Sequence, residues 1–386
     1  MRKVDKGVSR RDFLRTGSLG VAGLAGLAGW GATAADPNSP HAGNGHQAAE
    51  AAAAEHNHGG AGTVGEVDHE ANGFDPHEIL YDFDYGEVKE ENGRMVREWT
   101  LIAIDKEFEI APGLFFPGWV YGSTTSAASK RAGRVVGQCP GPTLRCIEGE
   151  LLRIHFTNAG THPHTIHFHG IHSAFMDGIP GVGRGMIETS ESFTYEFDAK
   201  PFGCHLYHCH AIPLKRHIHK GLYGAFIVDP DPEKYSGEEK EIAKTRNHQY
   251  PENEDFNEMV MVMNGFDTNF DGDNEVYAAN SIAFGYGMDR PIQIRHDQKQ
   301  RLYLINVTEF DPINSMHIHA NFFDYYDHGT TLQPTLKTVD TIMQCQAQRG
   351  ILEFSFEDFE RSLYMFHAHQ SEFAELGWMG FFQVVN

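Results

Sequence analysis

Four His-x-His pairs are the residues of this sequence whose types and spacing are best suited to chemistry. In an extended strand the side chains at positions i and i+2 project from one face about 7 Å apart, so one pair can serve two neighbouring metal ions. Neutral imidazole is a natural ligand for copper and zinc. A single pair would be weak evidence, but four pairs give eight histidines, enough for three metal ions. The pairs are His167/His169, His208/His210, His317/His319 and His367/His369.

Cys209 lies between His208 and His210, so its side chain points to the opposite face and belongs to a different site. A thiolate with two imidazoles and a weak or absent axial ligand is the blue-copper arrangement. His164 can supply one imidazole. The second should come from the loop before Gly221, where His217 is preferred over His219. A single buried cysteine is more often inert core, but the flanking histidines favour a ligand.

The elements that must position these residues are short strands arranged in an internal repeat. Residues 151–156, 192–197 and 350–356 alternate in polarity and are separated by Gly, Pro, Asn and Asp clusters, which predicts sandwiches or barrels. The pattern of residues 164–169, 208–210 and 221–224 returns at 314–319, 367–369 and 377–380. We therefore predict an all-β fold with two tandem β-sandwich domains, residues 78–230 and 255–386, joined by a charged linker at 231–254.

Composition and the N-terminus bound the setting of this chemistry. The 386 residues carry a net charge of −22, which argues against nucleic acid or an anionic membrane surface as a partner. No apolar run reaches the length of a membrane span, so the mature chain should be soluble. The stretch Ser9-Arg10-Arg11-Asp12-Phe13 with a short apolar run predicts a twin-arginine export signal over residues 1–34, and a periplasmic or extracellular location. Residues 35–77, low in complexity and rich in histidine, are interpreted as a solvated linker without site residues.

The combined histidine pattern resembles a known family. His164-x-x-His167-x-His169-Gly170, His208-Cys209-His210 and a downstream histidine are similar to the signature of the multicopper oxidases, which include laccases, bilirubin-oxidase-like enzymes and ascorbate oxidase. Residues 140–145 and the stretch Met176-Asp177-Gly178 also resemble the first cupredoxin domain of that family. The similarity covers roughly residues 95–386. Because only two repeats are present, the chain most resembles the two-domain, laccase-like members.

The resemblance implies a ligand set of four copper ions per subunit. His164, Cys209 and His217 match the type 1 ligands, and Leu222 falls at the axial position, where it cannot coordinate, so this copper should be three-coordinate and relatively oxidising. The second repeat has Asn314, Ala368 and Phe373 in place of such ligands, so its type 1 site is lost. The trinuclear ligands divide into His167 and His317 for type 2 copper and, for type 3 copper, His169, His208, His210, His319, His367 and His369.

The resemblance also implies an activity and an assembly. Single electrons from a reducing substrate, a phenol or aromatic amine, would be coupled to four-electron reduction of O2 to water. The trinuclear site would form between the first domain of one subunit and the second domain of the next, in a homotrimer. Asp177 resembles the family's acidic residue near the type 2 copper and is the first candidate proton donor, with a turn residue as the alternative. Glu372 is the second candidate, with a solvated acid as an equal alternative.

Other interpretations remain open from the sequence. A copper nitrite reductase also has two cupredoxin domains, but that family has Asp where His167 stands and lacks a histidine at position 210. A non-enzymatic blue-copper carrier would need only three ligands and would leave eight histidines unused. The natural reductant is also open among phenols, aromatic amines, metal ions and a protein donor. Residues 267–272 begin like a calcium loop but are interpreted as a turn, because the twelfth position is Ala278. Four further cysteines could pair with one another in three alternative ways. They are Cys139, Cys146, Cys204 and Cys345.

Overall fold

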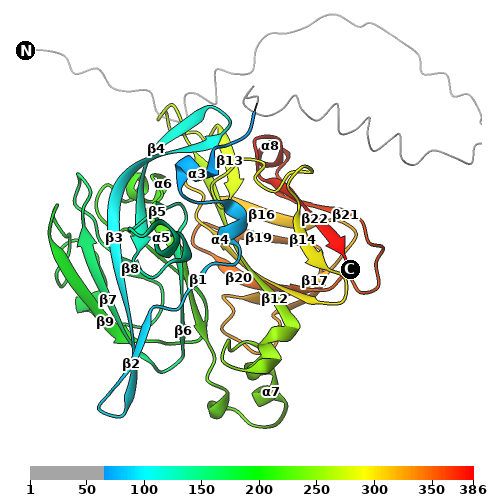
Figure 1. Ribbon diagram of the computed structural model, residues 1–386, viewed down its shortest axis with the longest axis horizontal. Helices are drawn as coiled ribbons and strands as arrows, with labels where there is room; N and C mark the ends of the chain where they lie inside the picture. The colour runs from blue at the N-terminus through cyan, green and yellow to red at the C-terminus, as the bar shows by residue number, and fades with distance from the viewer. Residues whose placement is uncertain (1–64) are drawn as a thin grey trace, which may run out of the picture. The chain divides into compact units, whose positions relative to one another are not determined.

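The computed structural model describes residues 65–386, and strands dominate it (Figure 1). The predicted export signal and residues 35–64 of the predicted linker lie outside the described residues. The three segments predicted as strands are strands: β7 (Leu151–Asn158), β9 (Ser192–Asp198) and β20 (Arg349–Phe354). In β7 every second residue is fully buried, as expected when one face of a strand packs on a core. The all-β prediction is confirmed.

The first half of the chain folds into two sheets. One has the strand order β5-β4-β3-β7-β9, and β2 pairs with β3 at its side; the other has the order β1-β6-β11-β10-β8. The further strands of this half are β1 (Phe83–Asp84), β2 (Glu87–Glu91), β3 (Arg94–Ala111), β4 (Leu114–Ser123), β5 (Gly137–Gln138), β6 (Gly141–Ile147), β8 (His167–Phe168), β10 (Gly203–His208) and β11 (Tyr223–Asp229).

The second half repeats the two-sheet arrangement. Its sheets have the orders β13-β12-β15-β20-β17-β18 and β14-β22-β21-β16-β19. Figure 1 shows the strands of this half in yellow to red. They are β12 (Phe256–Phe266), β13 (Val276–Ala279), β14 (Ile292–Arg295), β15 (Lys299–Asn306), β16 (Ile313–Ile318), β17 (Phe323–Asp327), β18 (Leu336–Val339), β19 (Thr341–Cys345), β21 (Leu363–His367) and β22 (Met379–Val385).

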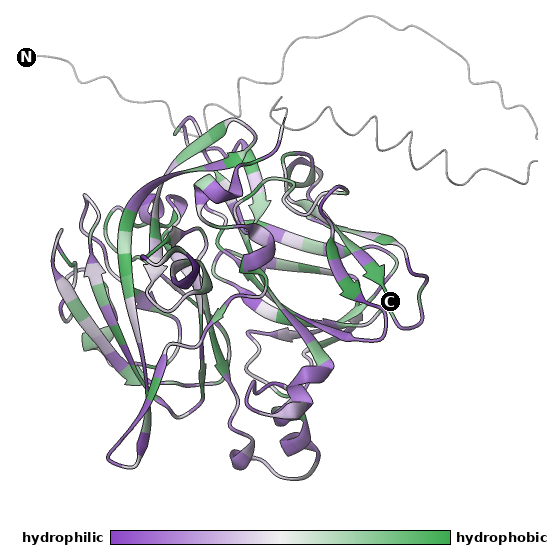
Figure 2. Cartoon of the chain, in the orientation of Figure 1, coloured by the Kyte–Doolittle hydropathy of each residue, from purple (hydrophilic) through white to green (hydrophobic). Residues whose placement is uncertain are grey.

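Helices are short and lie between the strands. Figure 2 shows apolar residues concentrated along strands, whereas α7, in the segment that joins the halves, is largely polar. Among the described residues no helix is both long and apolar enough to span a bilayer. The helices are α3 (His69–Asn72), α4 (Pro76–Ile79), α5 (Ala127–Ala132), α6 (Leu214–His219), α7 (Gly237–Thr245) and α8 (Ser371–Glu375), with 3-10 turns η2 (Ala174–Met176), η3 (Pro232–Lys234) and η4 (Pro251–Asp255).

The prediction that the linker extends to residue 77 is wrong, because residues 65–77 are part of the folded domain. The side chain of Asn72 at the end of α3 exchanges two hydrogen bonds with the backbone of Glu109 in β3, and Phe74 is buried. The carboxylates of Asp68 and Asp75 cap α3 and α4. These capping residues are local signals, and the low-complexity composition of the whole stretch hides them.

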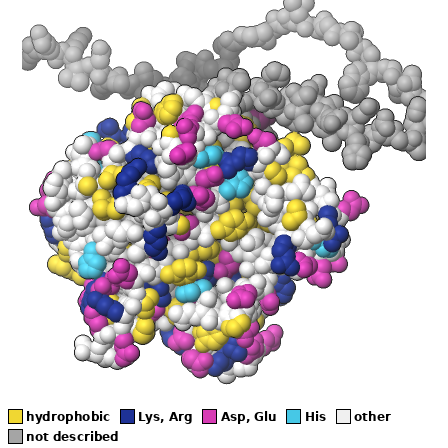
Figure 3. Space-filling model, in the orientation of Figure 1, with side chains coloured by type: hydrophobic (Ala, Val, Ile, Leu, Met, Phe, Trp, Pro, Cys, Tyr) yellow, Lys and Arg dark blue, Asp and Glu magenta, His cyan; other side chains and the backbone are white. Residues whose placement is uncertain are grey.

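The two halves share a core and a buried ion network. The guanidinium of Arg145 in β6 contacts the carboxylates of Asp229 in the first half and Glu258 in the second. Burial alone would raise the pKa of Glu258, but Arg145 and Arg301 hold it at about 2. Removing one partner would leave a buried charge uncompensated, so this network fixes one half against the other. At the surface, the face in Figure 3 carries acidic and basic side chains interspersed.

Candidate metal centre

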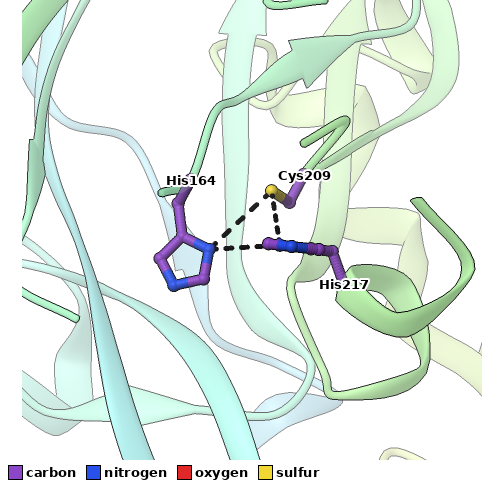
Figure 4. A group of neighbouring side chains, drawn as sticks. All are labelled: His164, Cys209 and His217. Carbon is purple, nitrogen blue, oxygen red and sulfur yellow. Dashed lines mark hydrogen bonds between the residues drawn. The ribbon is translucent and has the colours of Figure 1, made fainter. Parts of the chain in front are cut away.

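Three side chains converge in the first half, from the segment before β8, the residue directly after β10, and α6 (Figure 4). The Sγ atom of Cys209 lies 3.3 Å from Nδ1 of His217 and 4.0 Å from Nδ1 of His164. The two Nδ1 atoms are 3.2 Å apart. All three side chains are buried. Two nitrogens and one sulfur thus face a common point, as a small tight metal site requires.

Backbone hydrogen bonds hold this group in place. The N–H of Cys209 donates to the carbonyl of Leu222 at 2.9 Å, and His164 exchanges two backbone hydrogen bonds with Ile187. The N–H of Thr165 lies 3.3 Å from Sγ of Cys209, a contact that stabilises negative charge on sulfur. Leu222 is fully buried beside the group, and its alkyl side chain offers no donor atom.

Burial sets the protonation of the three donors. It lowers the pKa of His164 to about 3 and that of His217 to about 4, so both imidazoles are neutral at pH 7 and available as ligands. Burial raises the pKa of the Cys209 thiol to about 11. A bound cation would reverse that shift, because a coordinating thiol is deprotonated. The donor set therefore fits a soft, imidazole-binding metal ion.

His219, the alternative to His217, lies outside this group. Its Nε2 accepts a hydrogen bond from the backbone N–H of Asp267 at 2.9 Å, and its ring packs edge-on against Phe116 and Phe310. On α6, His217 and His219 are two residues apart and therefore point in different directions. The structure brings His217 to Cys209 and uses His219 to hold the second half.

The first-half histidine pairs lie on the other side of Cys209. They line a cavity of about 270 Å3 together with residues of both halves, including Leu206, Ile218 and Val307. The Nε2 atoms of His169 and His208 are 3.2 Å apart. Nδ1 of His208 donates to the carbonyl of Cys209, which leaves Nε2 as its free lone pair. The four histidines are His167, His169, His208 and His210.

Burial keeps most of this set neutral. Desolvation, aided by the neighbouring imidazoles, lowers the pKa of His169 to about 2 and that of His208 to about 3. Burial also lowers the pKa of His167, although the carbonyl and carboxylate of Asp177 oppose this shift. Neutral imidazoles are the form that binds metal ions.

The second-half histidine pairs form a similar set on β16, β21 and the residues that follow. The Nε2 atoms of His319 and His367 are 3.0 Å apart, and the rings of His317 and His319 are 5.0 Å apart. Unlike the first set, this one is open to solvent, with His319 and His369 exposed. Burial still lowers the pKa of His319 and His367.

The two sets are held by equivalent hydrogen bonds, as expected for two copies of one domain. Nδ1 of His167 donates to the carbonyl of Asp177, and Nδ1 of His317 donates to the carbonyl of Asp340, both at 2.8 Å. The N–H of His210 donates to Oγ1 of Thr165, and likewise that of His369 donates to Oγ of Ser315. The bond from Ala368 N–H to the Trp378 carbonyl corresponds to the one from Cys209 to Leu222. The bond from His367 Nδ1 to the Ala368 carbonyl corresponds to the one from His208 to Cys209.

In the second half other side chains fill the place of the sulfur site. Ala368 is buried where Cys209 stands in the first half, and Phe373 is stacked on Tyr277 with ring centroids 4.0 Å apart. Asn314, at the position of His164, donates its amide to Thr308 Oγ1. Neither a thiol nor an imidazole is left at this place, as expected from Asn314, Ala368 and Phe373 in the sequence.

Within one chain the two histidine sets stay apart. Among residues 65–386, no group of close donor atoms combines a first-half histidine with a second-half one. The sets therefore form two half-sites of four imidazoles each.

Comparisons with known proteins agree with this geometry. Two sequence profiles described as multicopper oxidase match residues 120–233 and 255–386. A solved structure titled as a multicopper oxidase is 52% identical, covers 83% of this chain and 100% of its own, and superposes with a TM-score of 0.71. The chain belongs to the multicopper oxidase family. Within the family it is consistent with the two-domain, laccase-like type.

The curated relatives match only short stretches of the chain, and the more distant structures support the fold alone. An L-ascorbate oxidase from Brassica rapa subsp. pekinensis is 39% identical over 113 residues, which are 27% of this chain and 19% of that protein. The match thus spans about a fifth of that relative's length. A copper nitrite reductase from Nitrosomonas europaea is 19% identical, covers 75% of this chain and 94% of its own, and has a TM-score of 0.59. At that identity the likeness concerns the fold alone.

The two predicted acidic residues are placed differently relative to the histidines. The carboxylate of Asp177 lies 2.9 Å from Nδ1 of His167 and 3.9 Å from Nε2 of His172. Glu372 is exposed on α8, and its carboxylate makes no hydrogen bond or ion pair with the described residues. One chain therefore brings Asp177, but not Glu372, to a histidine set.

Two residues that the sequence analysis does not single out lie against the donor sets. The Trp119 ring contacts the rings of both His164 and His217, at 5.3 and 4.8 Å between centroids. Arg349 reaches from the second half to Nδ1 of His205 at 3.2 Å and of His169 at 3.5 Å. Neither position has a motif, and only the packing of strands distant in sequence reveals them.

The remaining sequence candidates are structural in this chain. All five cysteines are free thiols, so none of the three connectivities forms within the described residues. In the acidic loop the carboxylate of Asp267 accepts the backbone N–H groups of Asp271 and Gly272, and Glu275 binds Thr268 and Asn269. These bonds are those of a turn, as expected.

Proposed function

We propose that this protein is a laccase-like oxidase that couples one-electron oxidation of a phenolic or aromatic-amine donor to the reduction of O2 to water. The observation that carries the proposal is the position of Cys209. Its side chain belongs to the three-donor site, and its two covalent neighbours, His208 and His210, belong to the first half of the histidine set. A short path of covalent bonds thus joins an electron-accepting site to an oxygen-reducing one.

The donor sets fit four copper ions per subunit. His164, Cys209 and His217 would hold one type 1 copper, and the neighbouring Leu222 side chain offers no donor atom. The eight paired histidines would hold one type 2 and two type 3 ions. Bound copper would supply one-electron uptake at the first place and four-electron reduction of O2 at the second. The chain supplies geometry, neutral imidazoles and protons.

Asp177 is the proposed proton donor. Its carboxylate contacts His167 and is only partly exposed, so it can pass protons between solvent and the histidine cavity. The His167 ring is oriented by the backbone carbonyl of Asp177, which accepts from Nδ1. Glu372 could deliver protons only if its helix, α8, lies against a histidine set of a neighbouring subunit, because it does not reach a histidine set within its own chain.

We infer a homotrimer in which the first half-site of one subunit meets the second half-site of the next. Each half-site is incomplete alone, and each lies in segments with exposed apolar side chains, which mark interaction surfaces. A head-to-tail contact of this kind forms a ring when the rotation between successive subunits closes. The exposed residues are Ile171, Phe175 and Ile212 near the first set, and Ile313, Phe322 and Met343 near the second.

Complementation between inactive variants tests this assembly. His208→Ala/His210→Ala breaks the first half-site, and His317→Ala/His319→Ala breaks the second. Neither variant should consume O2 alone. In subunits mixed by unfolding and refolding together, about a quarter of interfaces should pair two intact half-sites and recover activity. A mixture that stays inactive although mixed trimers are detected by mass spectrometry would show that each site lies within one chain.

The optical spectrum and the copper content test the function itself. Copper-loaded protein should show an intense visible thiolate band and a near-ultraviolet shoulder, and Cys209→Ser should remove only the visible band. Four copper ions per subunit and O2 consumption with 2,6-dimethoxyphenol support the oxidase. Two copper ions with nitrite reduction would indicate a nitrite reductase. Full copper loading without O2 consumption would indicate an electron carrier.

The predicted export signal supports a proposal about where this chemistry takes place. We propose that the chain is exported by the twin-arginine route and acts in the periplasm or outside the cell. Fractionation of cells that express the full chain, compared with an Arg10→Lys/Arg11→Lys variant, tests it. The variant should accumulate inside the cell with its N-terminus uncleaved.

A further inference from the structure

We propose that Trp119 and the exposed His162 form the route by which electrons reach the buried sulfur site from a donor outside the protein. This inference rests on the proposed function, because it requires a copper ion held by His164, Cys209 and His217. The donor would be a small one-electron reductant that binds at the surface and forms no bond to a ligand of that copper.

Burial of the ligands makes such a route necessary. His164 and Cys209 have no exposed surface, and His217 is 3% exposed. A donor molecule in solution therefore cannot make substantial contact with any ligand atom. Electrons must cross other protein atoms, and aromatic rings packed in contact with the ligands are the groups best placed to carry them.

The rings lie in sequence from surface to site. His162 is exposed, and its ring centroid lies 4.5 Å from that of Trp119. Trp119, 6% exposed, contacts the rings of both ligand imidazoles. Its position is fixed because its backbone N–H donates to the carbonyl of Lys220, close to α6.

The side chains around this route favour an electron-rich or anionic donor. The guanidinium of the exposed Arg216 lies 5.5 Å from the Trp119 ring, and the ammonium of Lys220 lies 5.9 Å from it. Asp105 is the acidic group nearby, and its carboxylate accepts the N–H of Thr161. A phenolate or an inorganic anion such as hexacyanoferrate(II) matches these charges. In the proposed step the donor loses one electron and copper(II) at the donor set gains it, while no bond forms or breaks.

The second half supplies a matched control. Tyr277 occupies the place of Trp119: its N–H donates to the carbonyl of Leu376, just as that of Trp119 donates to Lys220. It stacks on Phe373, which replaces His217, and its hydroxyl donates to Asp311 at 2.7 Å. An aromatic side chain at this position is thus part of the fold, but only Trp119 contacts metal donors.

The experiment follows one half-reaction in the copper-loaded protein. Under anaerobic conditions hexacyanoferrate(II) is mixed with wild type, Trp119→Leu and the control Tyr277→Leu, and bleaching of the visible band is timed. We expect Trp119→Leu to be slower by about tenfold and Tyr277→Leu to match wild type. Reoxidation of the reduced protein by O2 and the midpoint potential of the visible band should not change in either variant, because the proposal concerns electron uptake alone.

Other outcomes separate the two proposals. If Trp119→Leu fails to load copper, His162→Ala serves instead, since an exposed ring can be removed without disturbing the fold; it should also slow bleaching. Equal bleaching rates in wild type and both Trp119→Leu and His162→Ala would overturn the route, since the backbone of residues 162–164 would then suffice. A protein that binds copper but has no visible thiolate band would overturn the proposed function itself.

Discussion

Each half of the molecule has the same frame of backbone hydrogen bonds around one buried place, but the side chains inside this frame differ between the halves. The bond from Cys209 N–H to the Leu222 carbonyl recurs between Ala368 and Trp378. Inside that frame the first half buries a thiol and two imidazoles, and the second half buries Ala368, Phe373 and the hydrogen-bonded amide of Asn314. Backbone hydrogen bonds therefore fix the position of the site, and a few side chains decide whether it can bind a metal ion.

The difference also has an energetic cost on one side only. Unprotonated imidazoles and a thiol lose hydration when buried, which destabilises the metal-free fold unless a metal ion or hydrogen bonds compensate. The stack of Phe373 on Tyr277 loses no hydrogen bonds on burial. The first half thus keeps a costly site that a metal ion can stabilise, and the second half has replaced it with ordinary core.

The largest expected effect comes from replacing Cys209, and the matched residue in the second half is Ala368. Cys209→Ser should abolish the visible band and reduce O2 consumption to background, because a hydroxyl is a poor ligand for this metal and the first site empties. The matched change Ala368→Ser should leave both unchanged and cost only about 1–3 kcal/mol for a buried hydroxyl. Absorption spectra, oxygen electrode rates and thermal melts measure the pair. Residual visible absorption in Cys209→Ser would mean that the thiolate lies elsewhere.

The acidic residues that follow the two leading histidines offer the second comparison. Asp177 and Asp340 both accept from a ring Nδ1 through their carbonyls, but only the carboxylate of Asp177 lies close to that nitrogen, at 2.9 Å. We expect Asp177→Asn to lower kcat by about 10²-fold, the usual size of a lost acid or base. Asp340→Asn should keep wild-type rates.

The readout for this pair is the reoxidation of fully reduced enzyme by O2 in H2O and in D2O. Proton delivery by Asp177 predicts a slower step with a larger solvent isotope effect in Asp177→Asn, while copper content stays at the wild-type value. A loss of copper in place of a slower step would show that Asp177 holds His167 in position and does not deliver protons.

Restoring the three missing ligands in the second half tests whether its backbone hydrogen bonds are sufficient to position a metal site. The triple variant Asn314→His/Ala368→Cys/Phe373→His restores in the second half the donors that the first half has. Because the backbone hydrogen bonds are equivalent, we expect one additional copper per subunit and a visible band about twice as intense. The metal-free variant should be less stable by about 2–4 kcal/mol through loss of the Phe373 stack. Unchanged copper content in a folded protein would show that Trp378 or Tyr277 blocks the site.

Much of this site follows from the sequence, for a physical reason. Alternation along a strand dictates that Cys209 faces away from His208 and His210, so two sites could be separated without coordinates. The choice between His217 and His219 needed the structure, because it depends on which way one short helix turns. Trp119 and Arg349 could not be predicted, since they reach the donors across sheets that are distant in sequence. The folded residues 65–77 were missed because composition was averaged over a longer stretch.

The smallest expected effect is a difference in how acid destabilises the metal-free protein. In the folded chain burial holds the pKa of His217 at about 4, whereas the unfolded chain has an ordinary pKa of about 6.5. Between these values the unfolded state takes up a proton that the folded state does not, so stability falls as pH falls. Each such histidine contributes at most about 1.4 kcal/mol per pH unit. His164, with a pKa of about 3, adds a second contribution.

The variant Cys209→Ala/His217→Phe gives the first half two of the three residues that the second half has at this place and removes one of these histidines. Its free energy of unfolding should therefore fall less steeply from pH 6 to pH 5, by about 1 kcal/mol over that interval. Urea unfolding of chelator-treated protein at the two pH values measures it, and Cys209→Ala alone, which keeps both imidazoles, should retain the wild-type slope. Identical slopes in all three proteins would mean that His217 is already protonated in the folded metal-free chain, and the contrast in buried polarity between the halves would then be smaller than the geometry indicates.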